Sequence, residues 1–139
     1  WDKFISAYFF LKRGGSNKKY DKLIQQFLNT FPTINEFIYW FNKKTIYKFK
    51  SDYFMPQYKY ITNSKKEIII NHILRFESLN KDIQELSKTL NIHLDLPHRN
   101  KSNHNHYSTY YTEETKEIIG NIYKTDIELF GYTFENKKV

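Results

Sequence analysis

The sequence predicts part of an α/β fold that is mostly helical and has one or two strands. Three observations support this prediction. Apolar residues recur at helical spacing in several segments, and residues 67–76 contain the continuous apolar runs 68–70 and 73–74 that are typical of a buried strand. In addition, 40% hydrophobic with 19% aromatic residues can build a packed core. Two strands do not make a complete sheet. We therefore expect the 139 residues to form one piece of a single domain rather than an all-α bundle.

The first predicted helix covers residues 1–11, WDKFISAYFFL, and Gly14-Gly15 ends it. Ser6 lies on the opposite side from the apolar face. No N-cap or entry loop precedes the helix, and we therefore expect the chain to be a piece of a longer protein. The residues expected to form the buried face are Trp1, Phe4, Ile5, Tyr8 and Leu11.

Two further helices are expected over residues 20–31 and 34–41. Pro32 stops the first of them, and Thr33 with Glu36 resembles a capping box for the second. Residues 45–63 are aromatic and irregular, with a candidate short strand at 58–61.

The best strand candidate is residues 67–76, whose isoleucine runs are typical of a strand buried on both faces, as in a parallel sheet. Ser78 or Asn80 then caps a helix that ends near Asn91. Residues 97–111 are predicted to form a polar loop. The expected apolar stripe of the helix consists of Leu79, Ile83, Leu86 and Leu90.

The last predicted element is one long helix that Thr112 caps and Gly131 closes. Glu113 and Glu114 stand in its first turn, where carboxylates interact favourably with the helix dipole.

The charge balance indicates a general preference for anions and little more. The net charge is +7, but the 22 basic residues include only Arg13, Arg75 and Arg99, which leaves 19 lysines spread along the chain. Specific nucleic-acid recognition favours arginine, so we do not expect a nucleic-acid partner. No apolar run reaches the roughly 20 residues that cross a bilayer, and a membrane anchor could lie only in a missing upstream part. The sequence leaves open the oligomeric state and the choice between a cytoplasmic and a membrane-associated location.

No complete active site or metal site is expected. The chain has no cysteine, and His98, His104 and His106 lack an acidic partner in their loop, so we interpret them as solvated. Glycine patterns of nucleotide-binding loops and serine-hydrolase turns are absent. Two polar features remain open. Ser6 is either a solvent-facing residue or part of an anion site at a helix N-terminus, and loop 97–102 is either a flexible connection or a phosphate-binding lid.

Several short segments together resemble sulfotransferases that use 3'-phosphoadenosine 5'-phosphosulfate (PAPS), and in particular their Golgi-type carbohydrate branch. The first segment resembles the end of the family's RxPxDRxxSxY pattern, and the later ones resemble its PQ, RFE, LPHxNKS, YYT and DixxFGY elements. They span nearly the whole chain in the family's order. The matching segments are WDKFISAY (1–8), MPQ (55–57), RFESL (75–79) with Asp82, LPHRNKS (96–102), YYT (110–112) and DIELFGY (126–132).

The resemblance implies the C-terminal portion, residues 1–139, of a single P-loop-like sulfotransferase domain. PAPS is then the cofactor, and a carbohydrate hydroxyl accepts the sulfuryl group. Ser6 corresponds to the serine that binds the 3'-phosphate, and Lys3 stands where the family commonly has an arginine. Arg99, Lys101 and Ser102 correspond to a loop that approaches the nucleotide and the acceptor.

In the same family an arginine eight residues before the serine also binds the 3'-phosphate. The resemblance implies that this arginine, the phosphosulfate loop and the catalytic base belong upstream of residue 1. No catalytic residue is therefore expected among these 139 residues, and the chain alone should be inactive. We expect Asp126 to point inward and to accept a hydrogen bond or pair with a cation, with Arg75 as a candidate. The alternative function is a non-enzymatic basic helical module that binds anionic glycans or nucleic acid through its lysines.

Overall fold

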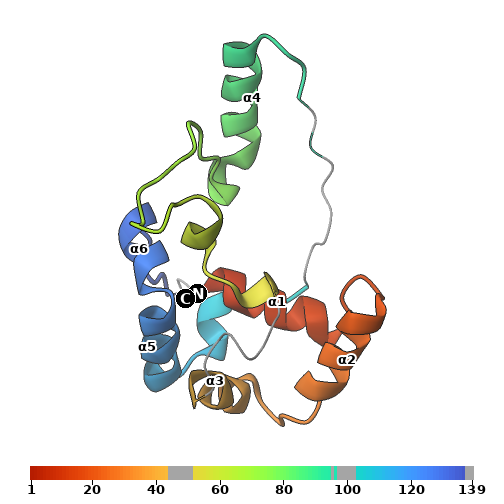
Figure 1. Cartoon of the computed structure of the whole chain (residues 1–139). Coiled ribbons are helices and arrows are strands. Elements are labelled where there is room, and N and C mark those ends of the chain that lie inside the picture. Colours follow the sequence, from red (N-terminus) through yellow and green to blue (C-terminus); the bar gives the residue numbers. More distant parts are fainter. Residues whose placement is uncertain (44–51, 95, 97–102, 137–139) are drawn as a thin grey trace. The chain divides into compact units, whose positions relative to one another are not determined.

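The computed structural model describes residues 1–43, 52–94, 96 and 103–136, and it divides the chain into two compact units (Figure 1). The first unit comprises residues 1–59 and 100–139, and the second comprises residues 60–99. The α-helices are α1 (Asp2–Lys12), α2 (Lys19–Leu28), α3 (Ile34–Lys43), α4 (Leu79–Leu90), α5 (Glu113–Ile122) and α6 (Lys124–Phe130). Short 3-10 helices are η2 (Asp52–Phe54), η3 (Gln57–Tyr60), η4 (Phe76–Ser78) and η5 (Tyr107–Tyr110). The described part is thus mostly helical, as expected.

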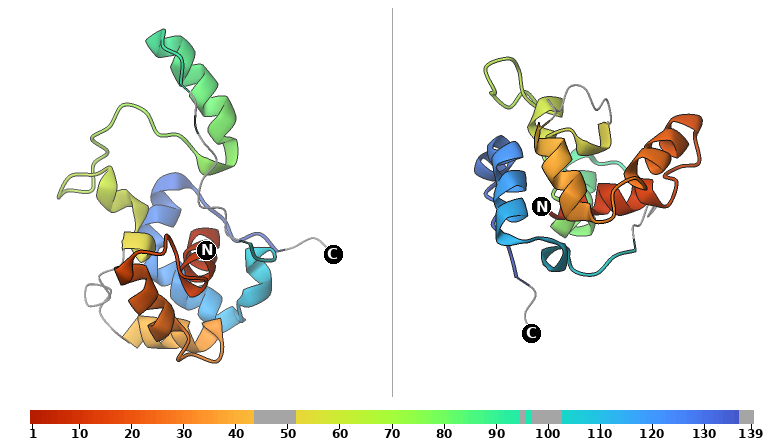
Figure 2. Two further views of the ribbon diagram at one scale, coloured as in Figure 1. Left: turned by 90° about the vertical axis from the view of Figure 1, so that its right-hand side faces the viewer. Right: turned by 90° about the horizontal axis from the view of Figure 1, so that it is seen from below.

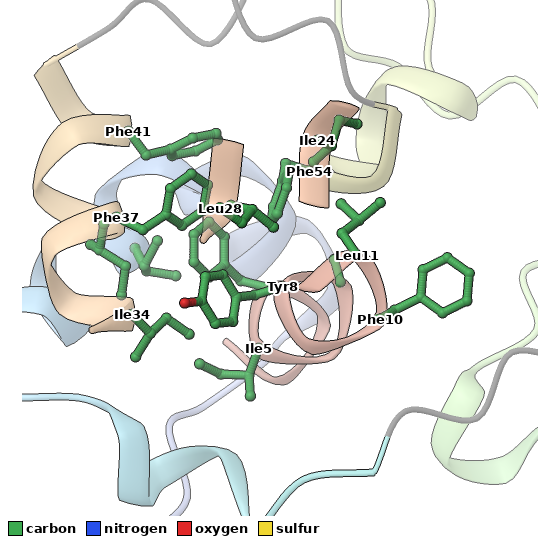
Figure 3. Packing of buried hydrophobic residues seen from close by; sticks show 14 of the residues in the cluster. Ile5, Tyr8, Phe10, Leu11, Ile24, Leu28, Ile34, Phe37, Phe41 and Phe54 are labelled. Atoms are coloured by element: carbon green, nitrogen blue, oxygen red, sulfur yellow. The ribbon is translucent and has the colours of Figure 1, made fainter. Parts of the chain in front are cut away.

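Helix α1 is the centre of the first unit (Figures 1 and 2). It contacts α2, η2 and η5, while α3 packs on α5. Of the predicted apolar face, Phe4, Ile5, Tyr8 and Leu11 are buried and Trp1 is partly buried. Ala7 and Phe10 are buried as well, so the helix is enclosed on most sides. Figure 3 shows the aromatic core that α1 shares with α2, α3 and η2. The core residues are Phe4, Ile5, Ala7, Tyr8, Phe10, Leu11, Ile24, Leu28, Ile34, Phe37, Ile38, Phe41, Phe54, Ile119 and Tyr123.

The capping box before α3 forms as the sequence predicts. The N–H of Glu36 donates to Thr33 Oγ1 and the N–H of Thr33 donates to a Glu36 carboxylate oxygen, both at 3.3 Å. Helix α2 ends at Leu28, earlier than expected, because the chain turns there and the N–H of Phe31 donates to the Leu28 carbonyl.

The expected long C-terminal helix is two helices instead. Thr112 caps α5 by accepting from the N–H of Thr115, and Gly131 closes α6 at φ +68°, both as predicted. The break falls at Tyr123, which has φ −103° and ψ 19°. Its buried hydroxyl donates to the Phe54 carbonyl at 2.7 Å, so a tertiary contact accompanies a break that no glycine or proline marks.

The turn after α1 makes a specific demand on Gly15. Its φ is +58°, and an added Cβ would lie 2.7 Å from Oδ2 of the buried Asp21, whose carboxylate accepts the Ser16 N–H. We expect Gly15→Ala to cost about 2–3 kcal/mol in the free energy of unfolding. Gly131→Ala is the matched control: φ is +68° but the space is open, and only the conformational cost of about 1 kcal/mol should appear. Chemical denaturation of both variants measures the difference, and equal losses would contradict the steric argument.

The predicted strand over residues 67–76 is wrong for this structure. Within the described residues the β pairing is one isolated antiparallel bridge, Thr62 to Ile68, and the second strand candidate at 58–61 overlaps the 3-10 helix η3. The isoleucines of the segment are exposed, with Ile69 63% exposed. A two-stranded hairpin is marginal in water, and the described residues offer no further strand to extend it.

Helix α4 belongs to the second unit and ends at Leu90, and its C-cap Asn91 has the left-handed conformation, close to the expected position. Ser78 stands at the N-cap. Of the predicted stripe only Ile83 is buried, and Leu90 is half exposed. Among the described helices, none has the length and apolar character needed to span a bilayer.

Candidate functional site

Three of the segments that carry the family resemblance meet at Asp126, which is 7% exposed. One carboxylate oxygen accepts the N–H of Gln57 at 2.7 Å and the other accepts the N–H of Tyr58 at 2.8 Å. The inward orientation and hydrogen-bonded state expected of Asp126 are therefore observed. We call Lys3, Tyr123, Asp126 and the backbone of residues 54–58 the Asp126 cluster.

Lys3 supplies the cation of this cluster. Its ammonium donates to the Met55 carbonyl and lies 5.8 Å from the centroid of the Tyr123 ring. Burial lowers the pKa of Lys3 to about 8, and the nearby Asp126 carboxylate opposes that shift. Burial also raises the pKa of Tyr123. The contacts of Lys3, at the position where the family commonly has an arginine, are thus contacts within the fold.

The YYT segment also packs on α1. Tyr111 is partly buried, and its hydroxyl donates to the Trp1 carbonyl at 3.0 Å. Burial raises the pKa of Tyr111. The ring of Tyr110 lies 4.8 Å from that of Phe9. Thr112, the last residue of the segment, caps α5.

Ser6 lies on the least buried face of α1, in a row that we call the open stripe. The members follow spacings of four, three and four residues, which place them on one side of a helix. Ser6 is half-buried and is the fifth residue of α1, so it is beyond the first turn. Of the two alternatives for Ser6, this position does not favour an anion site in which first-turn amides join its hydroxyl. The open stripe consists of Asp2, Ser6, Phe9 and Arg13.

The expected contact residues Arg99, Lys101 and Ser102 lie outside the described residues, as does His98. The chain that follows them reaches the open stripe, because the His104 ring stacks on Phe9 at 5.8 Å between centroids. The hydroxyl of Tyr110, from the same stretch, accepts the N–H of Asn105, and the Tyr110 ring lies against the Phe9 ring. The stretch after loop 97–102 is therefore adjacent to the face that carries Ser6.

A hollow of about 560 Å³ beside α5 is unsuited to a polyanionic nucleotide. Its lining includes Glu113, Glu114 and Glu117 with only one lysine, Lys116, and its remaining residues are Trp1, Gly120 and Asn121. Three carboxylates in one hollow repel phosphate and sulfate groups. Among the described residues, no group of three or more histidine, aspartate or glutamate side chains is arranged to hold a metal ion.

The RFE segment belongs to the second unit and begins the turn into α4. The N–H of Arg75 donates to Asp82 Oδ2 at 2.8 Å. This hydrogen bond, with one from Ser78, lowers the pKa of the Asp82 carboxyl. Both residues belong to the matching segment, and the contact gives that segment a local role in starting the helix.

Sequence reasoning did not anticipate the structural role of Lys3 or the hydrogen bond of Tyr123. The apolar spacing around Tyr123 indicated burial, but its partner Phe54 lies 69 residues away in the chain. Compared with known proteins, the chain matches no family model, no curated protein and no solved structure.

Proposed function

We propose that this chain is the C-terminal portion of a PAPS-dependent carbohydrate O-sulfotransferase, whose intact domain has an α/β, P-loop-like fold. One observation carries the proposal: separate segments with family resemblance are joined in the Asp126 cluster. Lys3 comes from the first segment, Met55 and the Gln57 N–H from the second, and Asp126 from the last. These part-buried hydrogen bonds between segments far apart in the sequence support the interpretation of the segments as parts of one family pattern.

In this proposal the open stripe of α1 binds a phosphate group of the cofactor. Ser6 offers a hydroxyl on a half-buried surface, and Arg13 adds a cation to the same face, although Asp2 at the other end opposes an anion. PAPS would supply the activated sulfuryl group. In this proposal the Ser6 hydroxyl donates to the 3'-phosphate, and Arg99, Lys101 and Ser102 of the loop add donors toward the nucleotide and the sugar acceptor.

Titration of the intact protein with adenosine 3',5'-bisphosphate tests the proposal. Ser6→Ala should weaken binding by about 10- to 100-fold, because a hydrogen bond to a charged group contributes about 1.5–3 kcal/mol. Adenosine 5'-monophosphate lacks the 3'-phosphate, and its weaker binding should not change with Ser6→Ala. Ser16→Ala, an exposed serine in the turn after α1, is the matched control and should bind like the wild type.

The basic-module alternative predicts a different pattern. Binding would then extend to heparin-like glycans or nucleic acid, would fall steeply with added salt and would be indifferent to Ser6. Such a result, without binding of the bisphosphate, would contradict the sulfotransferase proposal.

A further inference from the structure

The second unit exposes far more apolar surface than it buries. Among its described residues Ile83 is the buried apolar side chain, whereas nine large apolar side chains are more than a third exposed. Because single exposed apolar side chains are common on protein surfaces, the backbone must show which of these residues form an interface. The exposed residues are Tyr60, Ile68, Ile69, Ile70, Ile73, Phe76, Leu90, Ile92 and Leu96.

The exposed isoleucines coincide with an unpaired backbone. The hairpin stops after two backbone hydrogen bonds, from the Asn63 N–H to the Glu67 carbonyl and from the Ile69 N–H to the Ile61 carbonyl, each 3.0 Å. Within the described part of the chain, residues 70–74 make no hydrogen bond, and the backbone bends at Asn71. The segment includes the β-branched Ile70 and Ile73 and has no lysine, arginine or carboxylate, and its backbone groups are free, which is the condition for adding a strand.

The hairpin determines which backbone groups face the open edge. In an antiparallel pair, alternate residues direct their N–H and C=O groups to opposite edges. The Glu67 carbonyl and the Ile69 N–H face the first strand of the hairpin. In a continued strand the even-numbered residues 68, 70, 72 and 74 therefore present their backbone groups to a new partner.

A second copy of this segment fits that edge in one antiparallel register. If Asn71 lies on the two-fold axis, Ile70 pairs with His72 of the other copy and Ile68 pairs with Leu74, so every hydrogen-bonded pair joins two even-numbered residues. Ile69 then lies opposite Ile73 of the other copy, apolar against apolar. The segment 68–74 contains no lysine, arginine or carboxylate, so the net charge of +7 is not concentrated at this contact.

We propose that residues 68–74 are a self-association edge through which two copies of this chain form a two-fold antiparallel sheet. Each hairpin contributes its outer strand, and the contact is isologous, as in most homodimers. Pairing satisfies the outward-facing backbone groups of Ile70, His72 and Leu74, and it places Ile69 against Ile73 of the other copy. The inference does not depend on the proposed sulfotransferase function.

Sedimentation of the 139-residue chain over a range of concentrations tests the association. We expect a monomer–dimer equilibrium that Ile69→Glu and Ile73→Glu each weaken at least tenfold, because two carboxylates then face apolar partners. The double variant Ile69→Glu/Ile73→Lys places opposite charges across the axis and should restore the dimer. Leu90→Glu, an exposed residue of α4, is the matched control and should leave the dimer unchanged.

Cysteine cross-linking tests the register, since the chain has no cysteine of its own. Asn71→Cys should form a disulfide dimer in oxidised glutathione, because opposed residues of a non-hydrogen-bonded pair have Cα atoms roughly 4.5 Å apart. His72→Cys should not, because its two copies would be roughly 8 Å apart in this register. A chain that stays monomeric at all concentrations, larger aggregates without a dimer, or equal cross-linking of both variants would overturn the proposal.

Discussion

Replacing Asp126 with alanine is expected to lower the free energy of unfolding by about 3–5 kcal/mol, the cost of removing one partner from a buried charged group. The Asp126 carboxylate accepts the N–H groups of Gln57 and Tyr58 at 2.7 and 2.8 Å. The truncation leaves both donors without a partner. It also removes the negative charge that favours the partly buried Lys3 ammonium.

Thermal and urea unfolding of the variant measure this loss. Asp126→Asn keeps one acceptor oxygen and should cost less than the alanine. Glu128→Ala is the matched control on the same helix: its exposed carboxylate lies 3.7 Å from Lys124, a pair worth little in water, and stability should change by less than about 0.5 kcal/mol. An unchanged melting temperature of Asp126→Ala would refute the structural role of Asp126.

The helices could be predicted because their signals are local. The apolar spacing of residues 1–11, the Thr33 and Glu36 capping box and the Thr112 cap each depend on residues within one or two turns. All three appear in the structure. The division between α5 and α6 could not be predicted in this way, because Tyr123 is held by the Phe54 carbonyl, which is distant in sequence.

The strand over residues 67–76 shows the opposite case. Its composition satisfies every local criterion for a buried strand, but a strand is stabilised by pairing and by cover on its faces. The described residues supply one bridge and no cover, and Ile69 stays 63% exposed. Composition therefore identified a segment with a strong tendency to pair, and the partner determines whether the strand forms.

The candidate site was predictable in part. The resemblance identified Ser6, Lys3 and Asp126, and periodicity placed Asp126 on an inward face. Neither could show that Lys3 contacts Met55 and the Tyr123 ring, because these residues meet only in the folded chain. The resemblance placed Lys3 where the family commonly has an arginine, and in the structure its contacts are those of a partly buried structural cation.

The buried ammonium of Lys3 should make stability depend on pH in a specific window. Its pKa is about 8 in the folded chain against an ordinary value of 10.5, so between these values the unfolded state binds more protons. Stability attributable to Lys3 therefore rises with pH above about 8, by about 1.4 kcal/mol per unit, and is lost as the pH falls through 8. Burial raises the pKa values of Tyr111 and Tyr123, so these residues lower stability as the pH rises above about 10. The effect of Lys3 is therefore best measured below that pH.

Unfolding measured between pH 8 and 9.5 should accordingly show a gain of about 2 kcal/mol from Lys3 alone. Lys3→Met keeps the apolar stem and removes the charge, so the difference between wild type and variant isolates this contribution from other titrating groups. We expect the stability of the variant to change less with pH than that of the wild type. Relative to the wild type, the variant should therefore be most stable at pH 8 and lose ground as the pH rises. Parallel profiles for the two proteins would contradict a buried, titrating Lys3, and the ammonium would then have to remain solvated beside the Asp126 cluster.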